Sequence, residues 1–233
     1  MKYIKTHEWF LLCFMLVVNV AGIILSYTNE DIYQFFIRED SIVEWMTAGM
    51  LGVTSLICFA RLYSLRHRKS RIFLTMLFLM GLVFLFGMGE EISWGQRLLG
   101  LESPDFFTEH NAQQEMNLHN LQVGGVKINR LIFGKLLAIV LAFYLIVLPL
   151  LYHKSARIQQ LVTELAVPVP RWIFSLSFFL VFIILNIPDV TRKGELTEFT
   201  GSLIFLLVFL NPSNATVYVP AGEAPETTHS SLN

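Results

Sequence analysis

The sequence is poor in charged residues. Only 15% of its 233 residues are charged and 54% are hydrophobic, with a mean hydropathy of +0.57, whereas a soluble domain usually has about 25% charged residues. A core of this size cannot remove so much apolar surface from water. The composition therefore excludes an ordinary soluble domain and predicts that a lipid bilayer surrounds much of the chain.

Cysteine and net basic charge are also scarce. The two cysteines, Cys13 and Cys58, lie inside apolar runs, which is typical of small hydrophobic side chains rather than of a disulfide or a zinc site. The formal net charge is −1, and no basic block carries interleaved aromatic residues. These features predict membrane lipid as a partner and argue against a nucleic-acid partner.

Long apolar runs are what the sequence has in quantity. A membrane-spanning helix needs about 20 mostly apolar residues, and the candidates are residues 9–27, 42–60, 72–89, 131–152, 171–187 and 197–210. They predict an all-α fold, a polytopic membrane helical bundle with about six transmembrane helices in a single domain of residues 1–210. Because the last run is short and contains Glu198, five spans with a re-entrant last segment remain an alternative.

The segments outside these runs are interpreted from the same pattern. The first run is longer than the apolar region of a secretory signal and lacks an A-x-A-like cleavage site after it, so we expect a retained span. Residues 157–166 have the pattern of a short amphipathic surface helix. Residues 211–233 lose the apolar pattern and are expected to form a disordered tail.

Basic residues gather on one side of the spans. If the spans alternate in direction, ten of the 17 basic residues share a side, namely Lys2, Lys5, Arg61, Arg66, Arg68, Lys69, Arg71, Lys154, Arg157 and Arg171. Fourteen of the 18 acidic residues fall on the other side. Lys and Arg mark the cytoplasmic side, so the predicted topology is N-in and C-in, with the 90–130 loop on the periplasmic or extracellular side.

Two adjacent carboxylates open this loop. Glu90 and Glu91 end the third span, where they oppose the helix dipole and repel each other. Arg97, seven residues after Glu90, could pair with that carboxylate, and a bound cation would serve equally well. Alternatively, the charges cap the span in the headgroup region and Trp94 is an aromatic anchor at the membrane interface.

A second polar group follows in the same loop. If residues 109–120 are helical, Asn111, Glu115 and His119 lie along one stripe. A neighbouring polar stripe consists of His110, Gln114 and Asn117. A glutamate and a histidine one turn apart can bind one metal ion from a single helix face. A hydrogen-bonded polar loop is the alternative, because the sequence contains no complete H-E-x-x-H motif.

Polar residues recur near the same ends of the other spans, namely Glu44, Lys135, Asn186, Asp189, Glu195 and Glu198. With the loop residues they define one layer of the bundle. Charges buried in a membrane must be paired or bound to an ion, and they mark functional sites. We therefore expect a single polar network at this end of the bundle, roofed by the 90–130 loop.

Three stretches carry a resemblance. The runs GEEISWGQR and NLHN, together with EDSIVEWMTAG at 39–49, resemble a group of uncharacterised bacterial multi-pass membrane proteins. The resemblance covers about a third of the chain and implies a bacterial inner-membrane setting. It implies no activity, and it draws attention to Glu44, Trp45, Glu90, Glu91, Trp94, Arg97, Asn117, His119 and Asn120.

Three classes of function fit this pattern, so whether the protein is an enzyme stays open. The first is a metal-assisted hydrolase or transferase acting on a lipid or lipid-linked substrate. There Glu91, Glu115 and His119 would hold a divalent metal such as zinc, Glu90 would be the general base, and Arg97 would bind a phosphate. The second is a non-catalytic subunit or scaffold that docks an envelope protein through Trp94, Phe106 and Phe107. The third is a cation- or proton-coupled transporter.

Overall fold

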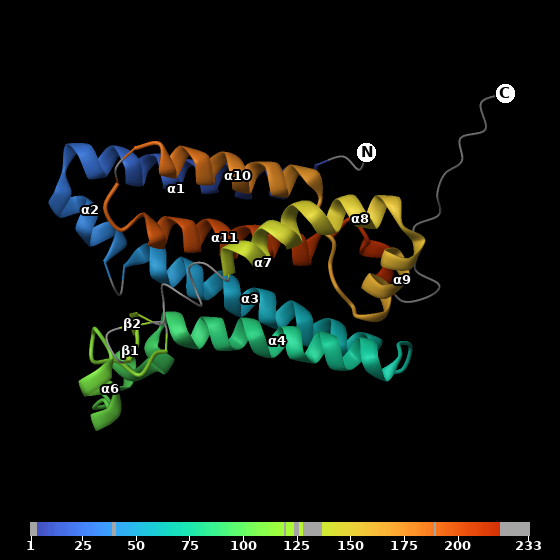
Figure 1. Cartoon of the computed structure of the whole chain (residues 1–233), viewed down its shortest axis with the longest axis horizontal. Helices are drawn as coiled ribbons and strands as arrows, with labels where there is room; N and C mark the ends of the chain where they lie inside the picture. The colour runs from blue at the N-terminus through green and yellow to red at the C-terminus, as the bar shows by residue number, and fades with distance from the viewer. Residues whose placement is uncertain are drawn as a thin grey trace.

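The computed structural model describes residues 4–38, 41–118, 120–123, 126–127, 137–188 and 190–219, and it is a bundle of helices (Figure 1). The long helices are α1 (Thr6–Thr28), α3 (Ile42–Leu65), α4 (Arg71–Glu91), α10 (Trp172–Asn186) and α11 (Lys193–Leu210). A further helix joins α7 (Leu137–Ala142), a π-helical segment (Phe143–Val147) and α8 (Leu148–Lys154). The predicted all-α fold class is confirmed.

Shorter elements connect these helices: α2 (Glu30–Ile37), a 3-10 turn (Ser93–Gly95), α5 (Gln96–Leu99), α6 (Asp105–His110), α9 (Ala156–Glu164) and a second 3-10 turn (Ala215–Tyr218). The two-residue strands β1 (Gln122–Val123) and β2 (Val126–Lys127) pair antiparallel. Helix starts follow capping chemistry: Ser41 caps α3 and Ser70 caps α4, each hydroxyl accepting from the third residue of its helix.

Among the residues that the structure describes, three helical segments are long and apolar enough to cross a membrane, Thr6–Thr28, Glu30–Leu65 and Arg71–Glu91, which is compatible with a membrane location. The predicted runs 131–152 and 171–187 correspond to shorter apolar helices, Ile139–Lys154 and Trp172–Asn186; residues 131–136 lie outside the described part. The predicted run 197–210 belongs to α11, whose 18 residues include three charges near its start.

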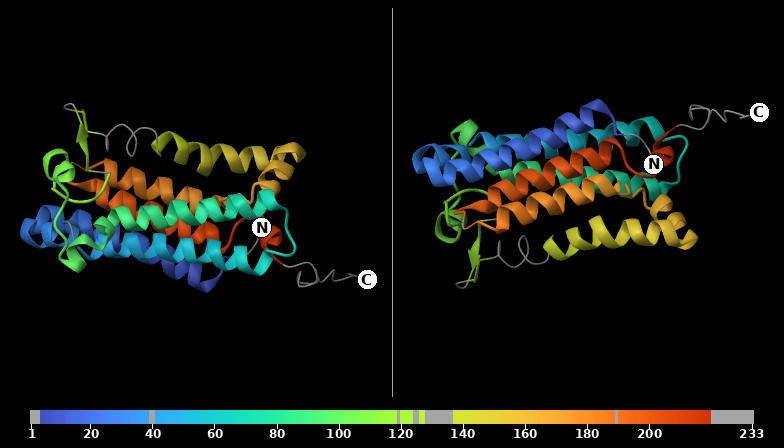
Figure 2. Two further views of the ribbon diagram at one scale, coloured as in Figure 1. Left: turned by 90° about the horizontal axis from the view of Figure 1, so that it is seen from below. Right: turned by 90° about the horizontal axis from the view of Figure 1, so that it is seen from above.

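The long helices run side by side along the long axis of the bundle (Figures 1 and 2). The start of α1, the end of α11 and helix α9 share one end, here called the terminal end. The segment from residue 92 to β2 lies at the opposite end, here called the loop end.

Helix α11 is the centre of the bundle and contacts α1, α3 and α10. Most of its side chains are buried, including Phe199, Leu203 and Leu207. Gly22 lets α1 approach α11, because a Cβ at Gly22 would lie 2.8 Å from Leu196 Cδ1. Small residues that allow such close approach are typical of helix packing in membranes. The α7–α8 helix lies at one edge of the bundle (Figure 2).

Two polar contacts join α1 to other parts of the bundle, one in its interior and one at the terminal end. Asn19 donates to the Thr200 hydroxyl (2.9 Å) inside the bundle. At the terminal end, Arg171 Nη1 lies 2.6 Å from Glu8 Oε1, and Glu8 is fully buried. Glu8 lies in the first turn of α1, and its partner Arg171 immediately precedes α10.

The tail expected from residue 211 is corrected in its first part. Asn214 is buried, accepts from Val169 N (2.9 Å) and donates to Val167 O (3.0 Å). The Tyr218 hydroxyl donates to Ala166 O (2.7 Å), and burial raises the pKa of this phenol. Residues up to 219 therefore pack against the linker before α10, while the rest of the predicted tail lies outside the described residues.

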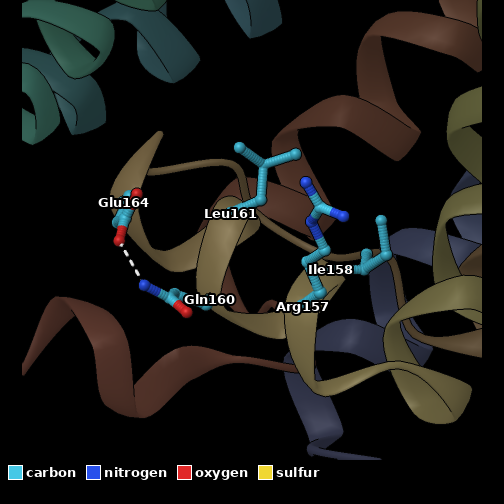
Figure 3. A pocket seen from close by; sticks show the side chains of 5 residues that line it. All are labelled: Arg157, Ile158, Gln160, Leu161 and Glu164. Carbon is cyan, nitrogen blue, oxygen red and sulfur yellow. Dashed lines mark hydrogen bonds between the residues drawn. The ribbon is translucent and has the colours of Figure 1, made fainter.

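The predicted amphipathic helix at 157–166 corresponds to α9. A surface hollow at the terminal end is lined by Arg157, Ile158, Gln160, Leu161 and Glu164 (Figure 3). Gln160 Nε2 donates to Glu164 Oε1 (2.8 Å) across one turn. None of the candidate site residues lines this hollow, so the chemistry predicted from the sequence must be sought at the loop end.

Candidate functional site

The site begins where α4 ends and the chain reverses direction. Ser93, Trp94 and Gly95 all have positive φ values, 46°, 54° and 75°, which is uncommon for residues other than glycine. The reversal lays the Trp94 ring back along α4, against Gly89 and Phe86. A Cβ at Gly89 would lie 2.8 Å from the Trp94 ring, and the Phe86 and Trp94 ring centroids are 5.7 Å apart.

Glu90 ties this turn to the distant NLHN run. Its Oε1 accepts from the Trp94 indole (2.9 Å) and its Oε2 accepts from Leu118 N (2.6 Å). The GEEISWGQR and NLHN runs are therefore in direct contact, although they are separated by about 20 residues of chain. Both oxygens of Glu90 are engaged in holding the loop, which does not suit the general-base role that the sequence suggested for it.

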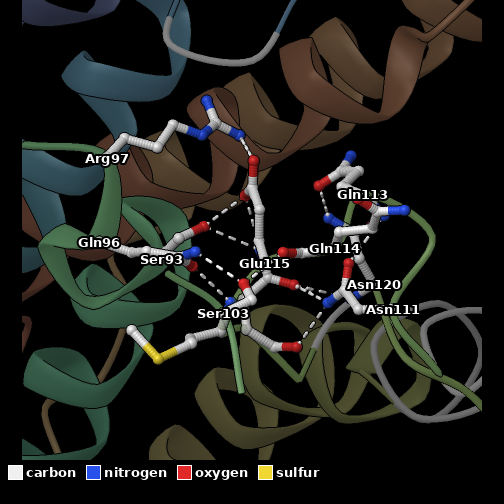
Figure 4. Close-up of polar contacts among 11 residues, drawn as sticks. Ser93, Gln96, Arg97, Ser103, Asn111, Gln113, Gln114, Glu115 and Asn120 are labelled. Atoms are coloured by element: carbon white, nitrogen blue, oxygen red, sulfur yellow. Dashed lines mark hydrogen bonds and ion pairs between the residues drawn. The ribbon is translucent and has the colours of Figure 1, made fainter. Parts of the chain in front are cut away.

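Arg97 pairs with Glu115, not with Glu90 as its spacing predicted. The predicted pairing assumed that α4 continues, whereas the reversal at 93–95 removes Arg97 from that helical face. The carboxylate of Glu115 also accepts from the Ser93 hydroxyl (2.5 Å) and from Asn117 Nδ2 (3.2 Å). Figure 4 shows the Arg97 guanidinium directed at this carboxylate. Glu115 is thus a buried, charge-compensated centre of the loop.

The predicted helix over residues 109–120 is wrong beyond its first two residues. Helix α6 ends at His110, and the Asn111 side chain accepts from Gln113 N (2.8 Å) in a local turn. Such side-chain-to-backbone bonds compete with helix formation. Gln114 then takes a φ of 60°. Asn111 and Glu115 therefore do not share a helical stripe, and His119 lies outside the described residues.

The rest of the loop is held by amides, which sequence reasoning underestimated. Asn111 Nδ2 donates to Asn117 Oδ1 (2.8 Å), and Asn117 Nδ2 donates to the Ser93 hydroxyl (2.9 Å). Gln96 donates to the Ser103 hydroxyl (2.6 Å) and accepts from Met116 N (2.8 Å). We call the described residues of this segment, 92–118 and 120–121, the loop cap. The feature of the sequence that could have indicated this folded loop is its high content of Asn and Gln. Their side chains can donate and accept hydrogen bonds without burying a charge.

Two predicted residues have peripheral places in the loop cap. The His110 ring stacks on Phe106 (4.8 Å between centroids), and its Nδ1 lies 3.0 Å from Phe106 O. Asn120 Nδ2 donates to Gln113 Oε1, and Asn120 O accepts from Ala112 N (3.0 Å). Both residues act within the loop cap and do not approach the carboxylates of the neighbouring helices through any of these contacts.

A group of carboxylates lies beside the loop cap. Glu91 is half-buried at the end of α4, within electrostatic reach of Glu198, Glu195, Glu44 and Glu90. They come from α3, α4 and the start of α11. We call these five residues the acidic layer. The structure thus brings together Glu44, Glu91 and Glu198, as the polar layer in the sequence predicted, while Lys135 and Asp189 lie outside the described residues.

A metal centre is not evident in the described part of the chain. No group of three or more His, Cys, Asp and Glu side chains there is arranged to hold a metal ion. Glu115, one of the predicted ligands, is instead compensated by Arg97. The predicted set of Glu91, Glu115 and His119 includes a residue outside the described part, so that complete set stays a prediction.

Comparison of the chain with protein-family models, curated proteins and solved structures finds no match. Function must therefore be argued from the loop end itself.

Proposed function

We propose that the protein binds a lipid or lipid-linked molecule at the loop end, with the acidic layer contacting the polar part of that ligand. The observation that carries this proposal is the convergence of carboxylates from α3, α4 and α11 around Glu91. Ionisable groups gathered at the end of membrane helices are costly and mark functional sites. Carboxylates suit a ligand that presents an amine or several hydroxyl groups.

The roles within the site follow from which carboxylates are already engaged. Glu90 and Glu115 hold the loop cap through the contacts described above. Glu91, which follows Glu90 directly, is the residue we assign to the ligand. If the bound molecule is also a substrate, Glu91 is the candidate general base of a hydrolase or transferase. Arg97 is assigned to the support of Glu115 rather than to a phosphate.

The topology that suits this proposal has six passes, with both ends of the chain in the cytoplasm and the loop cap on the periplasmic or extracellular side of the inner (plasma) membrane. It is supported by the asymmetry of basic residues and by the shared end of α1 and α11 in Figure 1. The ligand would then belong to the outer leaflet of that membrane.

Lipid retention tests the proposal. We expect wild-type protein, purified in mild detergent, to retain a defined lipid that native mass spectrometry and lipid extraction detect. Glu91→Gln should retain at least tenfold less, because the substitution replaces the carboxyl group at the centre of the acidic layer by an amide. Glu109→Gln, an exposed change on α6, is the matched control and should behave as wild type. Equal retention in Glu91→Gln, or no lipid in the wild type, would contradict the proposal.

A docking subunit is the second candidate. It is favoured by the exposure of two aromatic side chains at the loop end, Trp94 and Phe106, because aromatic side chains are frequent interface anchors. The metal-assisted reaction is distinguished from both by elemental analysis: near-stoichiometric metal in the wild type that is lost in His119→Ala would favour it.

A further inference from the structure

The polarity of the loop cap is inverted relative to a loop in water. Its interior is polar, with Ser93, Gln96, Asn111, Glu115 and Asn117 all buried. Its exterior carries three leucines, Leu98, Leu99 and Leu101, which are 66%, 70% and 50% exposed. We call these leucines the apolar ridge. A surface of this composition suits lipid acyl chains, since water would not favour three exposed leucines in six residues.

The position of the ridge agrees with its composition. Helix α4 has one exposed apolar stripe of Leu79, Leu82, Val83 and Phe86, at helical spacing. Because α4 is long enough to cross a membrane, this stripe would face lipid. The chain reversal lays Trp94 against Phe86 at the end of the stripe, so the loop cap starts at the depth of the last turn of α4. The ridge then follows Trp94 within a few residues.

Charge does not oppose insertion at the ridge. In the run QRLLGL (96–101), Arg97 is the single charged residue, and it is paired with Glu115. The next acidic residues, Glu102, Asp105 and Glu109, are exposed. They begin where the ridge ends and would mark the side of the loop cap that faces water.

We propose that the apolar ridge inserts into the lipid leaflet at the loop end, so that the loop cap is partly embedded in the bilayer. Lipid acyl chains cover the ridge in this proposal, because the ridge continues the lipid-facing stripe of α4. The inference is independent of the ligand proposed for the acidic layer, since it depends only on the outer surface of residues 98–101.

Site-specific fluorescence tests this inference. Leu99→Cys is made in a background with Cys13→Ala and Cys58→Ala, labelled with an environment-sensitive nitrobenzoxadiazole dye, and reconstituted in vesicles of phosphatidylcholine and phosphatidylglycerol. We expect blue-shifted emission and at least twofold quenching when the vesicles contain doxyl-labelled lipid. Leu98→Cys should behave in the same way, which guards against misfolding of one variant. Glu109→Cys on α6 is the control and should show red-shifted emission with little quenching.

Two results would overturn the inference. Emission from positions 98 and 99 that matches the control at position 109 would place the ridge in water. Blue-shifted emission without quenching by doxyl-labelled lipid would assign the ridge to a protein contact, such as a second copy of this chain. Neither result would bear on lipid retention through Glu91, so the two proposals fail separately.

Discussion

At the scale of single residues, the loop cap depends on which partner each charged side chain has. Glu115 and Arg97 form an ion pair whose side chains are 11% and 29% exposed. Both members of a pair this shielded from water are needed for stability. If one is removed, the other remains a partly buried charge without a partner, and the free-energy cost of its desolvation is no longer offset. The neutral donors Ser93 and Asn117 bind the same carboxylate, so removal of its charge would leave them with a weaker acceptor.

Glu115→Gln should loosen the loop cap. The substitution removes the charge opposite Arg97, and loss of a charged hydrogen-bond partner costs about 1–3 kcal/mol. We expect amide hydrogen exchange at residues 115–118 to become about 5- to 150-fold faster in the detergent-solubilised protein. Glu109→Gln should leave exchange unchanged. The double variant Arg97→Gln with Glu115→Gln should recover part of the loss, and strict additivity of the two single changes would argue against the pairing.

At the scale of elements, the junction between α4 and the loop cap depends on one glycine. A side chain at position 89 would meet the Trp94 ring at 2.8 Å. The tryptophan cannot move away from α4 without breaking its hydrogen bond to Glu90. The close packing of Trp94 on Gly89 therefore fixes both the chain reversal and the position of Glu90, whose carboxylate also binds Leu118 N.

Gly89→Ala should displace Trp94 and expose the loop cap to protease. Overpacking of this kind costs about 1–3 kcal/mol, so we expect the rate of limited proteolysis within residues 92–118 to rise severalfold. Gly49→Ala is the matched control, because nothing lies within 4 Å of a Cβ at Gly49. Equal cleavage rates for Gly89→Ala and wild type would show that the ring does not pack as described.

The helices of the bundle could be predicted from the sequence more completely than the site. Apolar runs of sufficient length identified α1, α3 and α4. A helix in lipid needs such a run regardless of which helices pack beside it, so the run can be recognised from the sequence alone. The convergence of Glu44, Glu91 and Glu198 was also predicted, since all three lie near the same ends of helices. The loop cap could not be predicted, because its conformation depends on local bonds such as Asn111 to Gln113 N that interrupt the helical pattern.

At the scale of the whole molecule, the proposed topology rests on the charge asymmetry of the sequence and on the arrangement of the helices. The start of α1 and the end of α11 share the terminal end, and the loop cap lies at the other (Figure 1). The most basic loop, residues 66–70, joins α3 to α4 at the terminal end. Since basic loops stay in the cytoplasm, the loop cap should be on the opposite side of the membrane.

Cysteine accessibility in intact cells measures this topology. In the cysteine-free background, we expect Glu109→Cys to react with a membrane-impermeant maleimide before lysis. Arg68→Cys and Ser213→Cys should react only after lysis. Full labelling of Arg68→Cys in intact cells would invert the proposed orientation. Labelling of positions 109 and 213 from the same side would contradict the odd number of passes, three in the proposed topology, between the loop cap and Ser213.

The ion pair between Glu8 and Arg171 has a consequence for the order of events during synthesis. The partners are 163 residues apart, and ribosomes add about 5–20 residues per second. The carboxylate in the first helix therefore waits roughly 10–30 seconds for its arginine. During that time α1 cannot take its final buried position without an unpaired charge. We therefore expect the nascent first helix to keep Glu8 in contact with water until α10 is made, so that α1 docks late even though it is synthesised first.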